Sequence, residues 1–268
     1  MRFARAVAMF LLAGMFVAAL LADWIAPARY DEQFRDQIEA APGPRFPLGT
    51  DELGRDRLSR LLHGARVSLV LAPSAALLGT LLAGVIGVLA GLRGGWTEKA
   101  VMLLADLFLA LPWLFLLLTV RAALPLNVTP WTSLVITFGL LSLLGWAGPA
   151  RVIRTCVKSL KEADFLLQAR ALGCHPARLV WLHLLPNLKA PLMAQFWFSV
   201  PAFILSEANL SLLGLGVAEP LPSLGALLRE LENISAVRSR PWMLAPAVVL
   251  LTIMCCFQFI FPKEDVVG

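Results

Sequence analysis

Charged residues and the residue types used in catalysis are both scarce in this chain. Only 15% of its 268 residues are Asp, Glu, Lys or Arg, whereas a soluble domain carries about 25%. His175 and His183 lie near Cys174, but this spacing matches no familiar zinc pattern. Cys255 and Cys256 are adjacent within an apolar run, where packing is the default role of a cysteine. These shortages argue against a soluble enzyme and against a metal site.

A basic patch interleaved with aromatic residues is also missing, although the net charge is +5. Charge patterning of this kind does not favour nucleic-acid binding. Basic residues that flank apolar runs instead meet the anionic headgroups of a bilayer. We therefore expect the lipid bilayer, and no nucleic acid, among the partners of the chain.

Hydrophobic sequence is abundant, at 59% of all residues. A helix needs roughly 17–25 predominantly apolar residues to cross a bilayer. A run at 100–120 is interrupted only by Asp106, and five uncharged runs approach or exceed the required length: 6–22, 67–92, 122–150, 190–206 and 241–262. The sequence therefore predicts an all-α fold, a polytopic membrane bundle of about six transmembrane helices.

The first run follows Arg2 and Arg5 and has some features of a secretory signal peptide. We expect an uncleaved first span, because the run is long for a signal peptide and no clear cleavage site precedes Asp23. The expected organisation is a first helix and outer segment at 1–66, a transmembrane core at 67–262 with a cytoplasmic loop at 151–189, and a short tail at 263–268.

Basic residues indicate which side of the membrane each connection faces, because cytoplasmic loops are enriched in Lys and Arg. An even number of spans places both termini on the same side. The segment 23–66 would then face outward, although its own arginines weaken this assignment. The loop at 151–189 favours cytoplasmic termini, since it holds Arg151, Arg154, Lys158, Lys161, Arg170, Arg178 and Lys189.

Residues 161–176 are typical of a short amphipathic helix followed by a turn. Gly173 supplies the left-handed conformation that ends a helix. A twelve-residue helix is marginal alone in water, so it needs a surface, either lipid headgroups or a protein. Composition does not choose between the two. The predicted helix covers 161–172, and its apolar stripe consists of Phe165, Leu166, Ala169 and Leu172.

Three blocks together resemble the permeases of binding-protein-dependent ABC importers. Residues 169–173, followed by 184–187, are similar to the "EAA" loop of that family. Residues 47–69 resemble the segment before the second span in the C-type subunit of the dipeptide, oligopeptide and nickel importers. Residues 205–216 resemble the fifth span of the same subunit. The blocks follow the family order from about 47 to 242, which is most of the chain.

The resemblance implies the type I ABC importer permease fold and a transport subunit that is not an enzyme. In that family the loop helix docks on a cytosolic ATPase, and ATP-driven closure of two ATPases switches the membrane bundle between inward- and outward-facing states. It also implies a homologous second permease, a periplasmic or extracellular substrate-binding protein and a bacterial inner-membrane location. This chain has no G-x-x-x-x-G-K-[ST] phosphate loop. We therefore expect ATP and Mg²⁺ on the partner ATPases and no cofactor here.

The matching loop also implies which residues touch the ATPase. One of them departs from the family, because Leu167-Gln168-Ala169 stands where Glu-Ala-Ala is usual and Leu167 replaces the glutamate. Coupling would then depend more on apolar packing. Residues 257–268 depart from the usual amphipathic end as well. The expected coupling set is Phe165, Leu166, Leu167, Gln168, Ala169, Leu172 and Gly173.

Two carboxylates, Asp106 and Glu207, lie inside apolar spans. An ionised carboxylate at the bilayer centre costs roughly 2.5–3.5 kcal/mol on insertion scales, so it normally faces the bundle interior, a partner or water. Both residues are candidates for the substrate pathway, where they would contact the amino terminus of a substrate. A structural hydrogen bond or a gate at the subunit interface is the alternative for each. Arg121, near a span end, is expected to snorkel to the interface.

Two other classes of protein stay open at this point. A self-sufficient secondary transporter or channel would use Asp106 and Glu207 as ion sites, but the two halves of the chain show no repeat. A membrane-embedded hydrolase would need a second mid-span aspartate or a Ser–His pair. The leading hypothesis is an ABC permease that forms half of a translocation path for di- or oligopeptides or similar solutes. Family membership does not identify the cargo.

Overall fold

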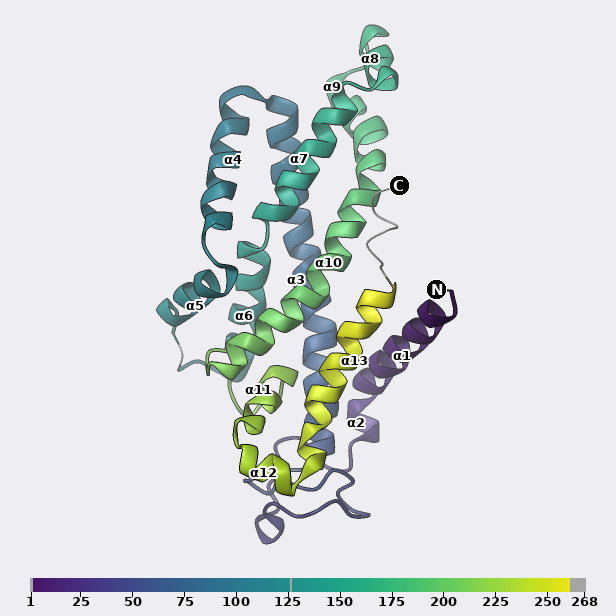
Figure 1. Cartoon of the computed structure of the whole chain (residues 1–268). Coiled ribbons are helices and arrows are strands. Elements are labelled where there is room, and N and C mark those ends of the chain that lie inside the picture. Colours follow the sequence, from purple (N-terminus) through teal and green to yellow (C-terminus); the bar gives the residue numbers. More distant parts are fainter. Residues whose placement is uncertain (1, 126, 261–268) are drawn as a thin grey trace. The chain divides into compact units, whose positions relative to one another are not determined.

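The computed structural model describes residues 2–125 and 127–260, and every regular element in these residues is a helix (Figure 1). The tail expected at 263–268 lies outside the described residues. The longer helices are α1 (Arg2–Leu20), α3 (Arg57–Arg93), α4 (Gly95–Ala110), α5 (Trp113–Ala123), α6 (Pro130–Leu144), α7 (Ala147–Lys161), α10 (Leu185–Leu212) and α13 (Ala245–Ile260). The shorter ones are α2 (Ala22–Ile25), α8 (Asp164–Ala171), α9 (Pro176–Leu179), α11 (Leu224–Arg229) and α12 (Ile234–Ser239). Single-turn helices lie at Arg35–Gln37, Glu230–Glu232 and Pro241–Leu244, and Val180–Leu184 is a π-helix.

Five continuous helical stretches of the described residues are long and apolar enough to cross a membrane, and α4 with α5 makes a sixth if the bent pair is one span. The five are Phe3–Leu20, Arg57–Arg93, Pro130–Lys161, Ala177–Leu212 and Pro241–Ile260. The all-α prediction with about six spans is confirmed. The expected run at 122–150 begins too early, because α5 extends to Ala123 and the next helix starts at Pro130.

The span expected as one helix at 100–120 is broken. Helix α4 ends at Ala110, α5 begins at Trp113, and the two helices meet at 92°. Pro112 explains the break, because proline has no backbone N–H and disfavours helical geometry in the residue before it. Leu111 accordingly adopts extended backbone, with φ −85° and ψ 136°.

The chain folds into two compact units. Unit 1 comprises 1–74, 120–138 and 201–268, and unit 2 comprises 75–119 and 139–200. Helices α3, α5, α6 and α10 contribute residues to both. The organisation expected from the sequence, with divisions after residues 66 and 262, stays a prediction.

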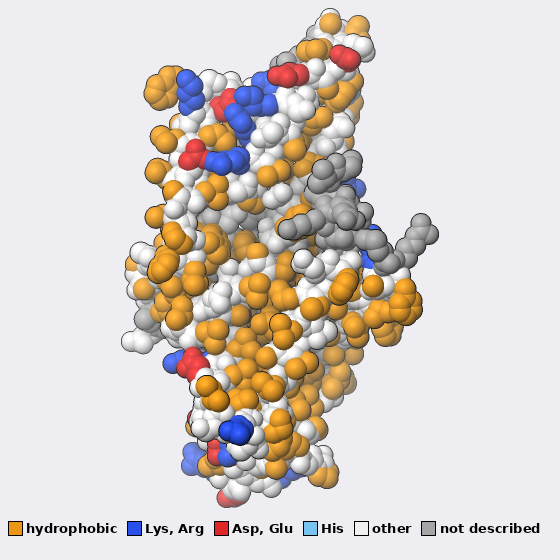
Figure 2. Space-filling view, in the orientation of Figure 1, with side chains coloured by type: hydrophobic (Ala, Val, Ile, Leu, Met, Phe, Trp, Pro, Cys, Tyr) orange, Lys and Arg blue, Asp and Glu red, His pale blue; other side chains and the backbone are white. Residues whose placement is uncertain are grey.

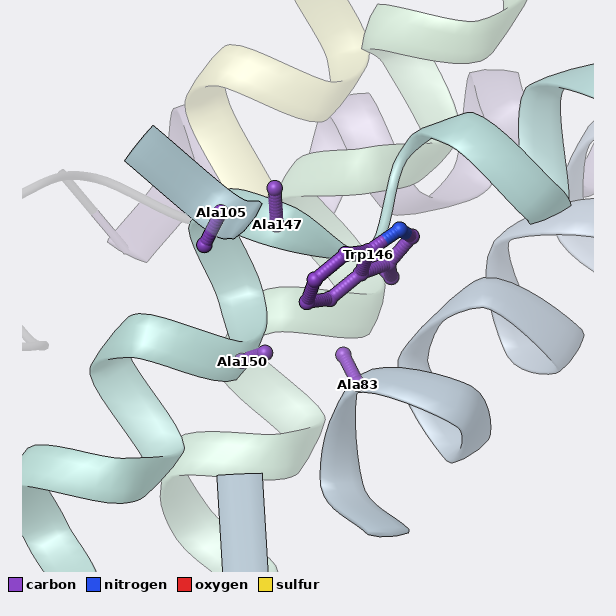
Figure 3. Packing of buried hydrophobic residues seen from close by; sticks show 5 residues of the cluster. All are labelled: Ala83, Ala105, Trp146, Ala147 and Ala150. Atoms are coloured by element: carbon purple, nitrogen blue, oxygen red, sulfur yellow. The ribbon is translucent and has the colours of Figure 1, made fainter. Parts of the chain in front are cut away.

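Small residues bring the helices of unit 2 together. Trp146, at the α6–α7 junction, packs among alanines (Figure 3). Its ring centroid lies 5.6 Å from that of Phe108 on α4. A Cβ atom at Gly87 on α3 would lie 2.6 Å from the carbonyl oxygen of Ala150 on α7, so only glycine permits this approach. The alanines of the cluster are Ala83, Ala105, Ala147 and Ala150.

In unit 1, α1 lies beside α13 (Figure 1). Ala8 packs against Cys256 and Ile260 there. Most of the remaining surface of α1 is apolar and exposed, including Phe3 and Phe10. Orange hydrophobic side chains cover the visible sides of the long helices in Figure 2, and the blue and red charged side chains gather in small groups. This surface suits a bilayer, where apolar side chains face lipid.

Candidate functional site

The turn after α7 contains a shorter helix than the sequence predicts. Helix α8 is Asp164–Ala171 rather than 161–172, because Lys161 still belongs to α7. The Lys161 ammonium donates to the carbonyl oxygens of Gly91 (3.2 Å) and Leu92 (3.0 Å), the last turn of α3. These carbonyls have no partner within their own helix, so the lysine both caps α3 and fixes the end of α7.

Helix α8 and the residues up to Gly173, called the α8 turn, present exposed apolar side chains. Leu172 is 87% exposed, Leu167 48% and Phe165 41%. Leu166 is fully buried, so the four residues of the expected apolar stripe do not form one exposed face. Leu166 instead packs beneath the exposed apolar side chains. Gln168 is exposed and Ala169 half-buried.

Gly173 ends the turn with a positive φ of 77°, as its sequence position predicts. No atom lies within 4 Å of the place where a Cβ would stand. The glycine is therefore required by backbone conformation rather than by space.

Asp106 on α4 forms an ion pair with Arg151 on α7. Closer to the N-terminus of α4, Glu98 pairs with Arg154 and lies 3.0 Å from the Lys158 ammonium. Two carboxylates of α4 thus meet three basic side chains of α7. The charge of Asp106 is compensated within unit 2, and its role in a substrate pathway stays a prediction.

Glu207 on α10 is fully buried, and Ser211, one turn later, donates a hydrogen bond of 2.7 Å to it. Ser223, the N-cap of α11, lies 3.5 Å from the Ser211 hydroxyl. Gly225 allows α11 to touch α10, because a Cβ there would lie 2.5 Å from the Cα of Ala208. Substrate contact with Glu207 also stays a prediction, and it requires a conformation in which this contact opens.

Arg121 does not snorkel. Its side chain is 2% exposed and turns into unit 1, where it donates to Ser133 Oγ (3.3 Å) and to the carbonyl of Pro125 (3.4 Å). The snorkelling expectation is wrong, because the short bent helix α5 ends beside α6 rather than at an open interface.

An ion-pair network in unit 1 was not predicted from the sequence. The segment before α3, together with the first turn of α3, lies more than 150 residues from the connection between α10 and α13. Several charge pairs nevertheless join the two. Arg55 and Arg60 both reach Glu219, at 2.7 Å and 3.0 Å. The other pairs are Arg57–Glu230 and Arg240–Glu39. Opposite charges in the two segments were visible in the sequence, but one sequence does not reveal which of them pair.

Electrostatics set the protonation of this network. Burial opposes ionisation of Glu219, but the attraction of Arg60, together with Arg55, outweighs it and holds the pKa of Glu219 below its usual value. Near α2, hydrogen bonds from His63 and Arg66 lower the pKa of Asp23. Glu219 and Asp23 are therefore ionised at neutral pH. The network borders a pocket of about 460 Å³ lined by residues such as Glu52, Arg229 and Glu232.

The described residues contain no group of three or more His, Cys, Asp or Glu side chains arranged to hold a metal ion.

Comparison with known proteins agrees with this architecture. Residues 83–262 match the family model for the binding-protein-dependent transport system inner membrane component. The chain is 38% identical over 221 residues to the di/tripeptide transport system permease protein DppC of Pseudomonas aeruginosa, covering 80% of this chain and 71% of that protein. It is 32% identical over 247 residues to the oligopeptide transport system permease protein OppC of Mycobacterium tuberculosis, covering 90% and 81%.

A third relative is the oligopeptide transport system permease protein OppC of Bacillus subtilis, 33% identical over 219 residues, with 81% of this chain and 69% of that protein covered. The family match and these relatives agree with the apolar helices of a multi-pass membrane protein. The chain belongs to the family of binding-protein-dependent transport system inner membrane components, and it is a transport permease rather than an enzyme.

Proposed function

We propose that this chain is the membrane-spanning permease subunit of an ATP-driven importer for di- or oligopeptides. The observation that carries the proposal is its similarity, over most of its length, to permeases named for di/tripeptide and oligopeptide transport. The chain would form half of the translocation path, and a homologous second permease would form the other half.

The 161–176 helix-turn is the proposed coupling element to a cytosolic ATPase. Three exposed apolar side chains, Phe165, Leu167 and Leu172, support this role, because such a cluster is costly in water and marks an interaction surface. The usual glutamate is replaced by Leu167, so the contact would depend on apolar packing. ATP and Mg²⁺ would be bound by two ATPase subunits and not by this chain.

Coupling to a cytosolic ATPase requires one orientation of the chain in the membrane. The 151–189 loop and both termini would lie in the cytoplasm, with the chain in the bacterial inner membrane. The ion-pair network of 23–66 and 219–240 would then face outward, where a substrate-binding protein delivers its cargo. Its many charges suit a surface in contact with water.

Asp106 and Glu207 are the proposed acidic residues of the pathway. Asp106 is about half exposed in this chain, and a half-exposed ion pair within a span needs water or a neighbouring subunit beside it rather than lipid. Glu207 would take part in a state in which α11 moves away from α10.

Reconstitution tests this function. The chain, its partner permease, both ATPases and the binding protein are placed in liposomes, and uptake of a mixture of di- and tripeptides is followed by mass spectrometry. We expect uptake to need ATP and every subunit. Uptake by the chain alone, driven by an ion gradient, would support a secondary transporter instead.

A further inference from the structure

Arg121 holds a positive charge inside unit 1 with few partners. Its side chain is 2% exposed, and its Nε has no hydrogen-bond partner among the described residues. Its two hydrogen bonds, at 3.3 Å and 3.4 Å, are long compared with the usual distance of about 2.9 Å. An arginine stays protonated in proteins, so the charge cannot be removed by losing a proton.

Other buried arginines of unit 1 are compensated differently. Arg55 pairs with Asp51 at 2.7 Å, and Arg60 pairs with Glu219 at 3.0 Å. Within residues 2–125 and 127–260, no carboxylate forms such a pair with Arg121. Buried charges in proteins are normally paired, so this guanidinium lacks an anion.

A series of contacts, called the polar chain here, connects this cation to a buried carboxyl group. Ser133, which accepts from Arg121, donates to the carbonyl of Gly216 at 3.1 Å. The next link is a packing contact, because a Cβ at Gly216 would overlap the Ser211 hydroxyl. Ser211 in turn donates to Glu207. Among the described residues of unit 1, Arg121 and Glu207 thus lie at opposite ends of the polar chain, and neither forms an ion pair.

We propose that Arg121 binds the terminal carboxylate of the substrate during transport. This proposal rests on the peptide-import function proposed above. A guanidinium offers two parallel N–H groups that match the two oxygens of a carboxylate. A peptide with free termini carries that carboxylate at one end and an ammonium at the other, and Glu207 is the acidic group at the far end of the polar chain.

Burial favours a substrate over an acidic side chain of a permanently attached subunit. A fixed neighbour must reach Arg121 in the resting assembly, but only 2% of the side chain is accessible even in the isolated chain. A substrate in transit needs access only in the state that opens the path. Helix α5 is suited to move, because it has only 11 residues and lies between breaks at Pro112 and Pro125.

The test uses the complete reconstituted transporter. A mixture of di- and tripeptides first identifies a peptide that the wild type imports. Initial uptake rates are then measured for that peptide and for its C-terminal amide, each at a concentration that saturates the binding protein. The variants are Arg121→Gln and Arg121→Lys. The matched control is Arg5→Gln, which removes an exposed arginine of the same unit.

We expect Arg121→Gln to lower uptake of the free acid about tenfold, the effect of losing a charged hydrogen bond, with amide uptake unchanged. Arg121→Lys keeps the positive charge but lacks the two parallel N–H groups of the guanidinium. We therefore expect a smaller loss of uptake, again for the free acid and not for the amide. The control should behave as wild type. Co-purification with the ATPases reports assembly. If Arg121→Gln does not assemble, the acid and amide uptake rates of Arg121→Lys test the proposal instead.

Equal losses for acid and amide in an assembled complex would overturn the proposal and assign Arg121 to structure or to a neighbouring subunit. Unchanged uptake of both peptides would overturn it too. If the wild type imports no peptide at all, the proposed function fails and this inference with it. Peptide import with an unaltered acid-to-amide ratio leaves the function standing and removes only the role of Arg121.

Discussion

Asp106 on α4 and Arg151 on α7 form an ion pair in which both side chains remain about half exposed, at 54% and 47%. The pair links the middle of one spanning helix to the helix that leads into the α8 turn. An uncompensated carboxylate at this depth would be costly, and Arg151 supplies the compensation. The sequence predicts that Arg151 belongs to the cytoplasmic loop at 151–189, but the residue lies within helix α7.

This pair should be measurable by a double-mutant cycle. We expect Asp106→Asn and Arg151→Gln each to destabilise the purified protein, and the double variant to lose less than the sum. The coupling energy should be about 0.5–1 kcal/mol, the upper range for exposed pairs. Thermal unfolding in detergent measures it. Strict additivity would show that the two side chains do not interact in solution.

Two substitutions of Glu207 should affect peptide uptake and protein stability differently. Glu207→Gln keeps an acceptor for Ser211, so we expect normal assembly with reduced peptide uptake. Glu207→Ala leaves Ser211 without its acceptor, and stability should fall by about 1–3 kcal/mol. Uptake and thermal stability of the assembled complex are compared, with Ser211→Ala as the control for the hydrogen bond alone. Wild-type uptake by an assembled Glu207→Gln complex would remove Glu207 from the pathway.

A valine at Gly173 should uncouple the complex. The glycine has φ 77°, a conformation that costs other residues about 1–2 kcal/mol and a β-branched residue more. Because no atom crowds the site, the effect would come from the backbone. ATPase co-purification and uptake report it. Gly43→Val is the matched control, since Gly43 also has open space but no positive φ. Equal behaviour of the two variants would refute the assigned turn.

Helix contacts in unit 2 allow a paired glycine test. A Cβ at Gly87 would stand 2.6 Å from a backbone oxygen of α7, whereas none of the described atoms lies within 4 Å of a Cβ at Gly139. We therefore expect Gly87→Ala to destabilise by about 1–3 kcal/mol. Gly139→Ala should be neutral or gain up to about 1 kcal/mol of helix propensity. A melting temperature that rises for both variants would contradict the close contact of α3 and α7.

Glu219 should give the ion-pair network of unit 1 an acid-sensitive stability. Its pKa is lowered in the folded protein, so its contribution is complete above about pH 4.5 and is lost as the pH falls through the lowered pKa. Glu230 acts in the opposite sense, because its burial raises its pKa against the attraction of Arg57. The test therefore compares the loss of stability on acidification between the wild type and a variant that lacks the Glu219 carboxylate. Between about pH 6 and about pH 3, the wild type should lose more stability than Glu219→Gln. Parallel curves would contradict the assignment.

The helices were predictable from the sequence because length and hydropathy determine what can span a bilayer. Gly173 and the helix before it were predictable for a local reason, since a left-handed glycine ends a helix wherever it stands. The bend at Pro112 was less predictable from the sequence, because proline in a membrane span can either kink a helix or break it. Its 92° angle depends on packing that local sequence does not encode.

The partners of charged residues were not predictable. Asp106 and Glu207 were recognisable as charges within apolar spans, but the pairing of Asp106 with Arg151 depends on how α4 meets α7. The contact of Arg60 with Glu219 joins residues 159 positions apart. Arg121 was assigned to the interface because its position near a span end resembles that of a snorkelling arginine. Only the structure shows that it turns inward.

The proposed coupling of this permease to an ATPase depends on the apolar side chains of the α8 turn. Leu172→Asp is the decisive variant, because Leu172 is 87% exposed and the change should leave the fold intact. Leu53→Asp, at an exposed leucine outside the loop, is the control. ATPase co-purification and ATP-dependent peptide uptake are measured on the same preparations. We expect both to be lost in Leu172→Asp, and ATPase co-purification to be kept in Leu53→Asp. A Leu172→Asp complex that retains its ATPases and imports peptide at the wild-type rate would contradict the account.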